Sequence, residues 1–581
     1  MKKIASTIAT IWRLSIPYFR SEDRWPGRIL LAAVIAMELS LVAVNVVLNL
    51  WYNRFYNTLQ DRDWNAFVSA ILFFCVLAAI YIVLAVYKTY LTQWLQIRWR
   101  RWMTQIYLQR WLHAANHYRM QLLGDAADNP DQRIAEDIKS FIDYALQIST
   151  GVLSSIVSFC SFVVILWVLS EQAPLHLFGA QIAIPGYLVW AALIYAALGT
   201  VLTHLIGWQL IPLNFQQQRF EADFRFNLVR TRENSEQIAA LGGDAAERDG
   251  HLGRFRPVIA NWLAIMQRTK LVNFFAAGYS QVSVIFPYIV VSPAYFAGAM
   301  QLGGLMQTAS AFDSVQKALS YFISNYQNIA EWRAVIDRLA GFEQSIEASR
   351  AAALAPPSVE VLQGSGAPFA AERLDVRLPD GEPIVAVDHI EFGAGDRVLI
   401  TGPSGSGKST LFRAIAGIWP FGSGRVHVPA NAKMMLIPQR PYFPVAPLAA
   451  AVSYPASAGA FDDARVAEAV VAVGLSELVP RLHEEEHWNR MLSLGEQQRL
   501  AIARALLHAP DYLLLDEATA SLDEAAEATL YRLLQERLKG TTIISIGHRS
   551  TLGAFHGRRV ELVPEAASFR VREVPLASAA E

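Results

Sequence analysis

Six apolar runs, each of about 20 residues or more, lie before residue 332, and this is the length that a helix needs to cross a bilayer. The third, fifth and sixth runs contain several polar residues, so their ends are less sharply defined. Of all residues 53% are hydrophobic and only 17% are charged, which fits a chain partly in lipid and partly in water. We predict membrane-spanning helices at Ile29–Trp51, Val68–Leu91, Ile142–Leu169, Ile184–Ile211, Leu271–Phe296 and Leu305–Ile329.

Positive charge is distributed unevenly between the connections of these helices. The connections after the second and fourth helices are long and rich in arginine, whereas those after the first, third and fifth are short and carry few cations. Because cationic loops remain in the cytoplasm, we predict that both termini and both long connections are cytoplasmic. The first apolar run follows a basic segment, has no small-residue cleavage site and is long enough to span a bilayer, so it is predicted to be a membrane helix rather than a signal peptide.

Composition argues against several other classes of protein. The net charge of -1 gives no indication of a nucleic-acid partner. The only two cysteines, Cys75 and Cys160, lie in apolar runs, so the sequence offers no disulfide framework or zinc site, and we expect both to be small, buried apolar residues. The run His483–His487 holds two histidines and three glutamates, and we interpret it as a solvated loop rather than a metal site.

The composition changes after Arg338. An Ala- and Pro-rich segment around Ala351–Pro357 predicts a linker, and from about Ala371 strands alternate with helical stretches, a pattern typical of a parallel sheet covered by helices. The chain contains no evident internal repeat. We therefore expect a membrane α-helical domain at 1–338, a linker at 339–370 and an α/β domain at 371–581.

A glycine-rich loop follows the predicted strand Arg397–Thr401. Its glycines let backbone N–H groups approach phosphate oxygens, its lysine reaches the β- and γ-phosphates, and its serine hydroxyl binds Mg²⁺. The helix that starts after the last glycine directs its positive end at the same oxygens. The residues predicted to bind the nucleotide here are Gly402, Pro403, Ser404, Gly405, Ser406, Gly407, Lys408, Ser409 and Thr410.

Two later strings narrow the class of nucleotide-binding protein. The string Leu492–Arg499, Leu-Ser-Leu-Gly-Glu-Gln-Gln-Arg, resembles the signature motif of ATP-binding cassette (ABC) proteins, and Tyr512–Glu517 follows it with three leucines, Asp and Glu. The resemblance implies an exporter-type ABC fold, with a P-loop ATPase domain that binds ATP and Mg²⁺. In such proteins the signature caps ATP bound to another subunit, here through Ser493, Gly495 and Glu496, so the single copy implies a homodimer.

The same resemblance gives each remaining motif a role. Ser409 and Gln439 would ligate Mg²⁺, with Asp516 accepting in the second shell. Lys408 and His548 would contact the γ-phosphate, and Glu517 would act as the general base for the attacking water. A histidine such as His548 is by itself more often an ordinary core or surface residue, but the order and spacing of the whole set favour catalysis. Ser521–Asp523 resembles the loop that contacts the partner's site.

The chain departs from the ABC pattern in two places. The signature has Leu494 where most members have Gly, and Glu496 where Gln is usual, although Ser493 and Gly495 are kept. The aromatic residue that usually stacks on adenine would fall near Leu378, and this segment has none. We therefore expect hydrolysis to be retained and selectivity for ATP over GTP to be weak.

Further strings resemble one branch of ABC proteins. Gly417–Pro420, Pro438–Tyr442 and the Leu-Ser-Leu-Gly-Glu signature are similar to bacterial relatives of the peroxisomal ABC subfamily, and Trp51–Asn57 and Asn129–Asp137 to SbmA/BacA-like transporters with a fused ATPase domain. The resemblance implies a transporter in the bacterial inner membrane. It would bind lipid and move a small molecule or peptide, with import of peptides or cobalamin-like compounds as the leading hypothesis.

Two other functions remain open at this point. One is export or flipping of lipid or acyl-CoA, and the other is a regulatory membrane ATPase, against which the intact Glu517 argues. Several polar residues lie in the predicted spans. Glu38 requires either a cavity or a charged partner, His204 is a similar case, and we expect Asp313 and Lys317 to pair with each other at i,i+4.

Overall fold

The computed structural model describes residues 2–123, 129–172, 175–177, 180–182, 184–364, 368–565 and 568–574. It divides into two compact units. Unit 1 comprises Met1–Gln109 and Asp128–Glu343, and unit 2 comprises Arg110–Ala127 and Gln344–Glu581. The segment 339–370, predicted as a linker, contains the end of helix α13 (Tyr326–Leu354) and strand β3 (Glu360–Gly364). Alanine, glutamate and arginine between residues 343 and 354 favour this helical continuation.

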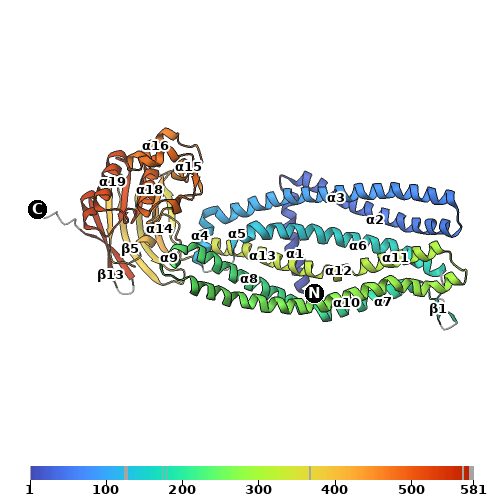
Figure 1. Cartoon of the computed structure of the whole chain (residues 1–581). Helices are drawn as coiled ribbons and strands as arrows, with labels where there is room; N and C mark the ends of the chain where they lie inside the picture. The colour runs from blue at the N-terminus through green and yellow to red at the C-terminus, as the bar shows by residue number, and fades with distance from the viewer. Residues whose placement is uncertain are drawn as a thin grey trace. The chain divides into compact units, whose positions relative to one another are not determined.

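Unit 1 is a bundle of long helices (Figure 1). They are α1 (Lys2–Arg20), α2 (Arg24–Gln60), α3 (Trp64–Leu112), α6 (Ile138–Gln172), α7 (Tyr187–Gly207), α8 (Leu210–Glu233), α10 (Asp244–Phe296), α11 (Leu302–Leu319) and α13 up to Glu343. The short helix α12 (Tyr321–Ser324) lies between α11 and α13.

Five helical segments are long and apolar enough to cross a membrane within the part of the chain that the structure describes. They are Arg24–Gln60, Trp64–Leu122, Pro130–Glu171, Tyr187–Gly207 and Asp244–Phe296, and they contain most of the first five predicted runs. The sixth predicted run, Leu305–Ile329, is divided between α11, α12 and the start of α13. Polar residues of this run, among them Gln307, Asp313 and Asn325, make it less apolar than the other five.

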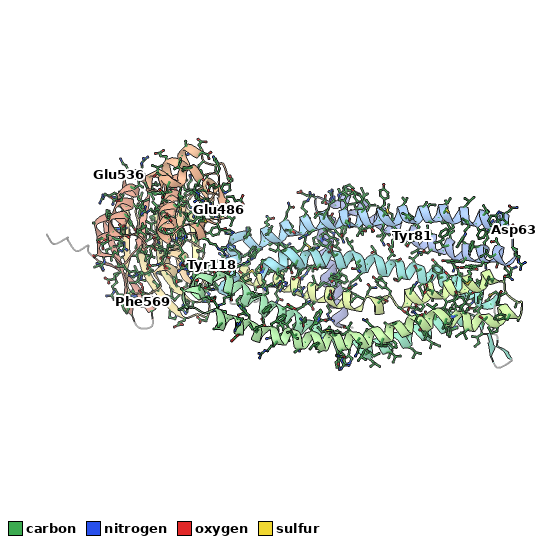
Figure 2. The ribbon with its side chains drawn as sticks, viewed as in Figure 1. Asp63, Tyr81, Tyr118, Glu486, Glu536 and Phe569 are labelled. Carbon is green, nitrogen blue, oxygen red and sulfur yellow. The ribbon has the colours of Figure 1, made fainter. Side chains whose placement is uncertain are left out.

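The segments of unit 1 that are apolar enough to cross a membrane carry many apolar side chains both inside and outside. Leu166, Leu188, Val291 and Phe312 join α6, α7, α10 and α11 in a buried cluster. Outward-facing side chains are also largely apolar, as at Tyr81 of α3 (Figure 2), and a bilayer can solvate such a surface.

The expected burial of the two cysteines was wrong, because both Cys75 on α3 and Cys160 on α6 are exposed. An apolar run in a membrane helix faces lipid as readily as protein, so apolar neighbours in the sequence do not imply that a residue is buried among side chains.

Several charged side chains in unit 1 form ion pairs, some between helices and some within one helix. Glu38 of α2 is buried and forms an ion pair with Lys88 of α3, which supports a structural pairing for this carboxylate over the lining of a cavity. Asp313 and Lys317 of α11 form the predicted i,i+4 pair, with 2.7 Å between carboxylate and ammonium. Pairing offsets the cost of holding a charge in a membrane helix.

The densest of these pairings surrounds Asp137. This residue ends a π-helical turn (Arg133–Asp137) that precedes α6, and its side chain is 4% exposed. Its carboxylate accepts hydrogen bonds from Arg133 at 2.6 Å and from Arg338 of α13 at 3.0 and 2.6 Å. Two guanidinium groups on one carboxylate therefore tie the start of α6 to α13.

Replacing Asp137 with Asn should destabilise the protein strongly, because two arginines would lose their counter-charge. Breaking a buried ion pair costs about 3–5 kcal/mol. Asp313→Asn is the matched control, since it removes one carboxylate from an exposed i,i+4 pair worth roughly 0.5 kcal/mol. Thermal unfolding in detergent should therefore show a large fall in melting temperature for Asp137→Asn and almost none for Asp313→Asn. Equal melting temperatures for the two variants would contradict this role for Asp137.

Unit 2 is built on a ten-stranded sheet with the order β3-β7-β4-β5-β14-β13-β6-β12-β11-β8. The strands β8, β11, β12, β6 and β13 are mutually parallel, whereas β4 and β14 form antiparallel pairs. Besides β3 the strands are β4 (Phe369–Arg377), β5 (Pro383–Phe392), β6 (Arg397–Thr401), β7 (Gly422–Pro429), β8 (Met434–Ile437), β11 (Tyr512–Asp516), β12 (Thr542–Ile546), β13 (Arg558–Glu565) and β14 (Ser568–Val574).

The two faces of this sheet pack against different apolar cores. Along β11, Leu513 and Leu515 enter one cluster and Leu514 enters the other, because successive side chains of a strand point to opposite faces. The three consecutive leucines of β11 therefore indicate a strand that is buried on both faces. The helices of unit 2 include α4 (Asn116–Leu122), α14 (Lys408–Ile415), α15 (Leu448–Ser453), α16 (Asp463–Ala472), α18 (Leu494–His508) and α19 (Glu524–Arg537).

Candidate active site

Four neighbouring parallel strands end at the same edge of the sheet in unit 2. The glycine-rich loop follows β6, Gln439 follows β8, Glu517 follows β11 and His548 follows β12. Ligands of open α/β sheets bind at the carboxyl ends of the strands. The order β6-β12-β11-β8 thus brings together residues that are more than a hundred positions apart in the sequence.

The loop after β6 curls around the side chain of Lys408. Gly405 and Gly407 have φ angles of 79° and 86°, which residues with a Cβ rarely adopt. A Cβ on Gly407 would also lie 2.4 Å from Ile384. The Lys408 ammonium donates to the carbonyl oxygens of Gly402 at 3.0 Å and Pro403 at 2.8 Å. Burial lowers the pKa of Lys408, while the charges of Glu517 and Asp516 oppose this shift.

Oxygen donors suited to Mg²⁺ gather beside this loop. The Ser409 hydroxyl on α14 donates to the Asp516 carboxylate at 2.9 Å. Burial raises the pKa of Asp516, and the hydrogen bond from Ser409 counteracts it. Hydroxyl, carboxylate and amide oxygens are the ligand types that Mg²⁺ prefers, so Ser409, Asp516 and Gln439 fit the predicted ion. When bound, Mg²⁺ would neutralise the charge of the β- and γ-phosphates.

Glu517 is held by two other candidate residues. Its carboxylate accepts a hydrogen bond from the Gln439 amide at 3.0 Å and contacts the His548 ring nitrogen Nε2 at 3.1 Å. Its own φ angle is 50°, a conformation uncommon outside glycine. The turn after β11 therefore fixes the carboxylate at the strand ends, where a general base for an attacking water would lie.

The signature residues lie at the start of α18. Ser493 caps this helix: its hydroxyl accepts from the Glu496 backbone N–H, and the Glu496 carboxylate accepts from the Ser493 N–H at 2.8 Å and its hydroxyl at 2.7 Å. This reciprocal arrangement is a capping box, which takes Glu or Gln at the third position. Glu496 therefore substitutes for the usual Gln with its capping function intact. Among the described residues, no hydrogen bond joins these residues to the Gly402–Thr410 loop of the same chain.

Three polar residues that the sequence analysis did not single out connect these motifs. Gln498 of α18 donates to the Gln439 carbonyl at 3.0 Å and accepts from the Ser521 N–H at 3.0 Å. Asn489 accepts from the Phe443 N–H at 2.9 Å. Arg504, whose pKa burial lowers to about 10, donates to the carbonyl oxygens of Tyr442 and Ala451. The segment that begins at Gln439 is therefore hydrogen-bonded to Gln498 and Arg504 of α18 and to Asn489 of the short helix α17 (Trp488–Met491).

Leu378 lies just beyond the end of β4, where the sequence analysis found no aromatic residue for adenine. Its side chain is partly buried and packs against the apolar core that includes Val385 and Trp419. Trp419 itself is buried and donates its indole N–H to the Arg377 carbonyl at 2.9 Å. Weak selectivity between ATP and GTP stays a prediction.

The helical bundle and the phosphate-binding sheet together define an ABC transporter half, and comparison with known proteins agrees. The family model described as ABC transporter transmembrane region 2 matches residues 14–296, and the ABC transporter model matches residues 387–520. The chain belongs to the ABC transporter family and is related to its D-type, peroxisomal-type members. It is an ABC half-transporter in which ATP hydrolysis drives transport across a membrane.

Several relatives match almost the whole chain. The inner membrane ABC transporter ATP-binding protein YddA of Escherichia coli is 33% identical, with 92% of this chain and 93% of that protein covered. The chloroplastic ABC transporter D family member 2 of Arabidopsis thaliana is 32% identical, covering 96% and 87%. The human lysosomal cobalamin transporter ABCD4 is 26% identical, covering 88% and 87%. A bacterial Atm1-family ABC exporter with ATP bound has the same fold, with a TM-score of 0.72, 19% identity and coverage of 93% and 94%.

Replacing Glu517 with Gln should leave ATP binding intact and lower the rate of hydrolysis by about two or more orders of magnitude, because a positioned general base contributes that much. Phosphate release and equilibrium nucleotide binding measure the two effects separately. Glu536→Gln, at an exposed position on α19 (Figure 2), is the matched control and should hydrolyse ATP normally. Turnover of Glu517→Gln within a factor of two of the unmodified protein would remove Glu517 from this role.

Replacing Glu496 with Ala should slow hydrolysis, whereas Glu496→Gln should not. The Ala variant loses the acceptor that holds Ser493, and loss of a helix cap costs about 1 kcal/mol, or roughly a five-fold rate if fully felt in the transition state. Gln keeps an acceptor oxygen and satisfies the capping box. Steady-state ATP hydrolysis by the two variants measures the difference, and equal rates would show that the capping box does not position Ser493.

Proposed function

We propose that two copies of this chain form a homodimer that imports a hydrophilic solute, a peptide or a cobalamin-like compound, across the bacterial inner membrane. The proposal places the chain in the SbmA/BacA-like branch and places both termini in the cytoplasm. The Mg²⁺ of each ATP would be held by Ser409, Gln439 and Asp516. The observation that carries the hydrophilic solute is the polar face of α6.

One side of α6 and of the π-helical turn before it is polar along most of its length. Polar side chains recur at intervals of three or four residues, which places them on one face of a helix with 3.6 residues per turn. The face comprises Glu136, Lys139, Ser140, Asp143, Tyr144, Gln147, Thr150, Ser154, Ser155, Ser158 and Ser161. The opposite face carries Ile138, Phe141, Ile142, Ala145, Val152 and Ile156.

The polar face of α6 contacts polar residues of α12 and α13 in the same chain. The Tyr144 hydroxyl donates to the Glu331 carboxylate of α13, and the Tyr321 hydroxyl of α12 donates to the Gln147 carbonyl at 3.4 Å. A Cβ on Gly151 would collide with the Tyr321 ring, so the two helices approach closely there. Polar residues on a membrane helix are stable against protein or water and costly against lipid. A water-accessible path beside α6 explains so many polar positions.

The polar face of α6 also helps to choose between the candidate solutes. Acyl chains of a lipid or acyl-CoA substrate would be better solvated by apolar side chains than by this row of hydroxyls, amides and charges. The name of the human relative, a lysosomal cobalamin transporter, also supports a hydrophilic solute. A purely regulatory ATPase has no need of the Glu517, Gln439 and His548 arrangement found here. Transport of a hydrophilic solute is therefore favoured over the flipping of lipid and over regulation.

Uptake of labelled cobalamin and of a labelled proline-rich peptide tests the proposal in cells that lack their own importers for both. We expect one of the two compounds to accumulate when the chain is produced. The Glu517→Gln variant is the matched control and should abolish accumulation, since the carboxylate drives hydrolysis and not solute binding. Accumulation of neither compound, with hydrolysis intact, would overturn import of these solutes and favour export.

A further inference from the structure

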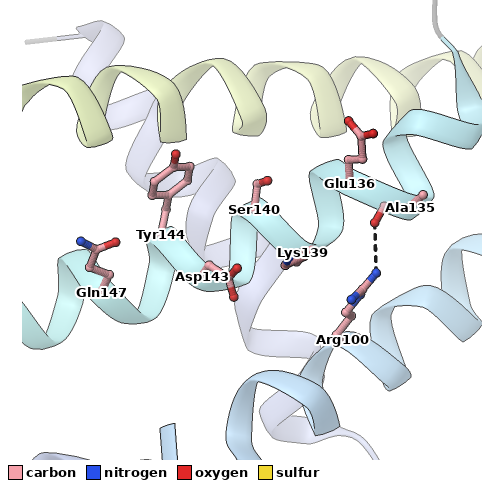
Figure 3. Close-up of a pocket in the computed structure, with 8 residues that line it drawn as sticks. All are labelled: Arg100, Ala135, Glu136, Lys139, Ser140, Asp143, Tyr144 and Gln147. Carbon is pink, nitrogen blue, oxygen red and sulfur yellow. Dashed lines mark hydrogen bonds between the residues drawn. The ribbon is translucent and has the colours of Figure 1, made fainter. Parts of the chain in front are cut away.

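A polar cavity of about 670 Å³ lies in unit 1 between α3 and the first turns of the polar face of α6 (Figure 3). This volume is in the range of sites that bind small molecules. Its walls include two cations, two acids and an amide, contributed by Arg100, Glu136, Lys139, Asp143 and Gln147. Arg100 comes from α3, and the other four lie along α6 and the turn before it.

The four charged groups around the cavity differ from the buried carboxylates Glu38 and Asp137 of unit 1. In the described part of the chain, Arg100, Glu136, Lys139 and Asp143 take part in no ion pair, whereas Glu38 and Asp137 are paired. Lys139 is three residues from Glu136 and four from Asp143, spacings at which ion pairs commonly form on a helix. Here Lys139 and Arg100 act on Asp143 only by Coulomb attraction over a longer distance than an ion pair.

Two of the groups are held by neutral partners. The Arg100 guanidinium donates to the Ala135 carbonyl at 3.1 Å, as the dashed line in Figure 3 marks, and the Glu136 carboxylate accepts from the Gln132 amide at 3.2 Å. Each contact orients a charged group without neutralising it. Charges of both signs are therefore set around one space, and a ligand with both signs would complement them.

We propose that this cavity binds the zwitterionic part of the transported solute, a peptide-like molecule with an ammonium and a carboxylate. Arg100 and Lys139 bind the carboxylate, Asp143 and Glu136 bind the ammonium, and the Gln147 amide bonds to the peptide group between them. A guanidinium is well suited to a carboxylate because it can donate two parallel hydrogen bonds. The proposal rests on the proposed function, and it specifies the class of solute.

An aminophospholipid head group carries the same two charges. Its acyl chains would require an apolar path next to the head group, whereas the face of α6 that leads away from the cavity continues through Thr150, Ser154 and Ser158. The observations therefore favour a soluble zwitterion over a lipid.

Binding of tri-alanine to the full-length protein tests the proposal, measured by calorimetry in nanodiscs of phosphatidylglycerol. N-acetyl-tri-alanine amide has the same backbone without either charge and should bind at least about ten-fold more weakly, a difference of about 1.4 kcal/mol. Arg100→Gln and Asp143→Asn should each weaken tri-alanine binding about ten-fold. Arg100→Lys keeps the charge and should retain most of the affinity, and Asp313→Asn, on the exposed pair of α11, should change nothing.

Three results would overturn the zwitterion site: no binding of tri-alanine, equal binding of the capped peptide, or unchanged affinity in both charge-removing variants. Loss of tri-alanine binding when phosphatidylethanolamine is added to the nanodiscs would assign the cavity to a lipid head group and would also overturn it. Basal ATP hydrolysis reports whether each variant is folded, because Arg100 and Asp143 belong to unit 1 and the catalytic residues to unit 2.

Thiol labelling separates failure of this site from failure of the proposed function. Gln147→Cys and Ser154→Cys, without Cys75 and Cys160, should react with a membrane-impermeant thiol reagent if the polar face is wet. Ile156→Cys, exposed but about 200° around the helix from Ser154, should not react. Labelling of the polar face without tri-alanine binding would contradict the proposed zwitterion site and leave the hydrophilic path supported. Equal labelling of Ile156→Cys and Ser154→Cys would contradict both the hydrophilic path beside α6 and the proposed zwitterion site.

Discussion

A charge that leaves water must gain a partner, and most of this structure follows from that requirement. In the membrane unit, Asp137 gains two arginines and Glu38 gains Lys88. Each pairing joins two helices: Asp137 ties the start of α6 to the distant α13, and Glu38 ties α2 to α3, the next helix along the chain. Apolar contacts alone would leave the rotation of these helices about their axes poorly defined, because lipid solvates apolar side chains as well as protein does.

The same requirement shapes the ATPase unit. Lys408 is nearly buried, and two carbonyl oxygens of its own loop accept its hydrogen bonds. Glu517 is shared between Gln439 and His548, which come from two different strands. Lys408 and Glu517 are thus each oriented by other candidate residues, so the geometry of the candidate site depends on the sheet rather than on any one loop. Preorganisation of this kind is what phosphoryl transfer requires, since it depends on positioning and on neutralising charge.

Features that depend on residues close together in the sequence were predicted, whereas features that depend on contacts between separate helices or strands were not. Strand Arg397–Thr401 and the start of helix α14 after Gly407 were predicted to the residue, because local spacing determines them. The partner of Glu38 was not predicted, since the pairing of α2 with α3 leaves no trace in the spacing of either helix. Gln498 was read only as part of the signature string, although its amide joins Gln439 to Ser521. The burial of Cys160 was misjudged because apolar patterns cannot distinguish lipid from protein.

Within residues 133–161, some charged side chains form ion pairs and others do not. At Asp137 the charges are fully paired and rigid, and one turn further the charges at Lys139 and Asp143 are unpaired and border a cavity. A helix that served only to hold the bundle together would gain from pairing them as well, since an i,i+4 pair stabilises a helix by a few tenths of a kcal/mol. Leaving them apart forgoes that stabilisation and keeps both signs of charge available. The contrast with the buried, fully paired Asp137 one turn away is what a binding site for a polar solute requires.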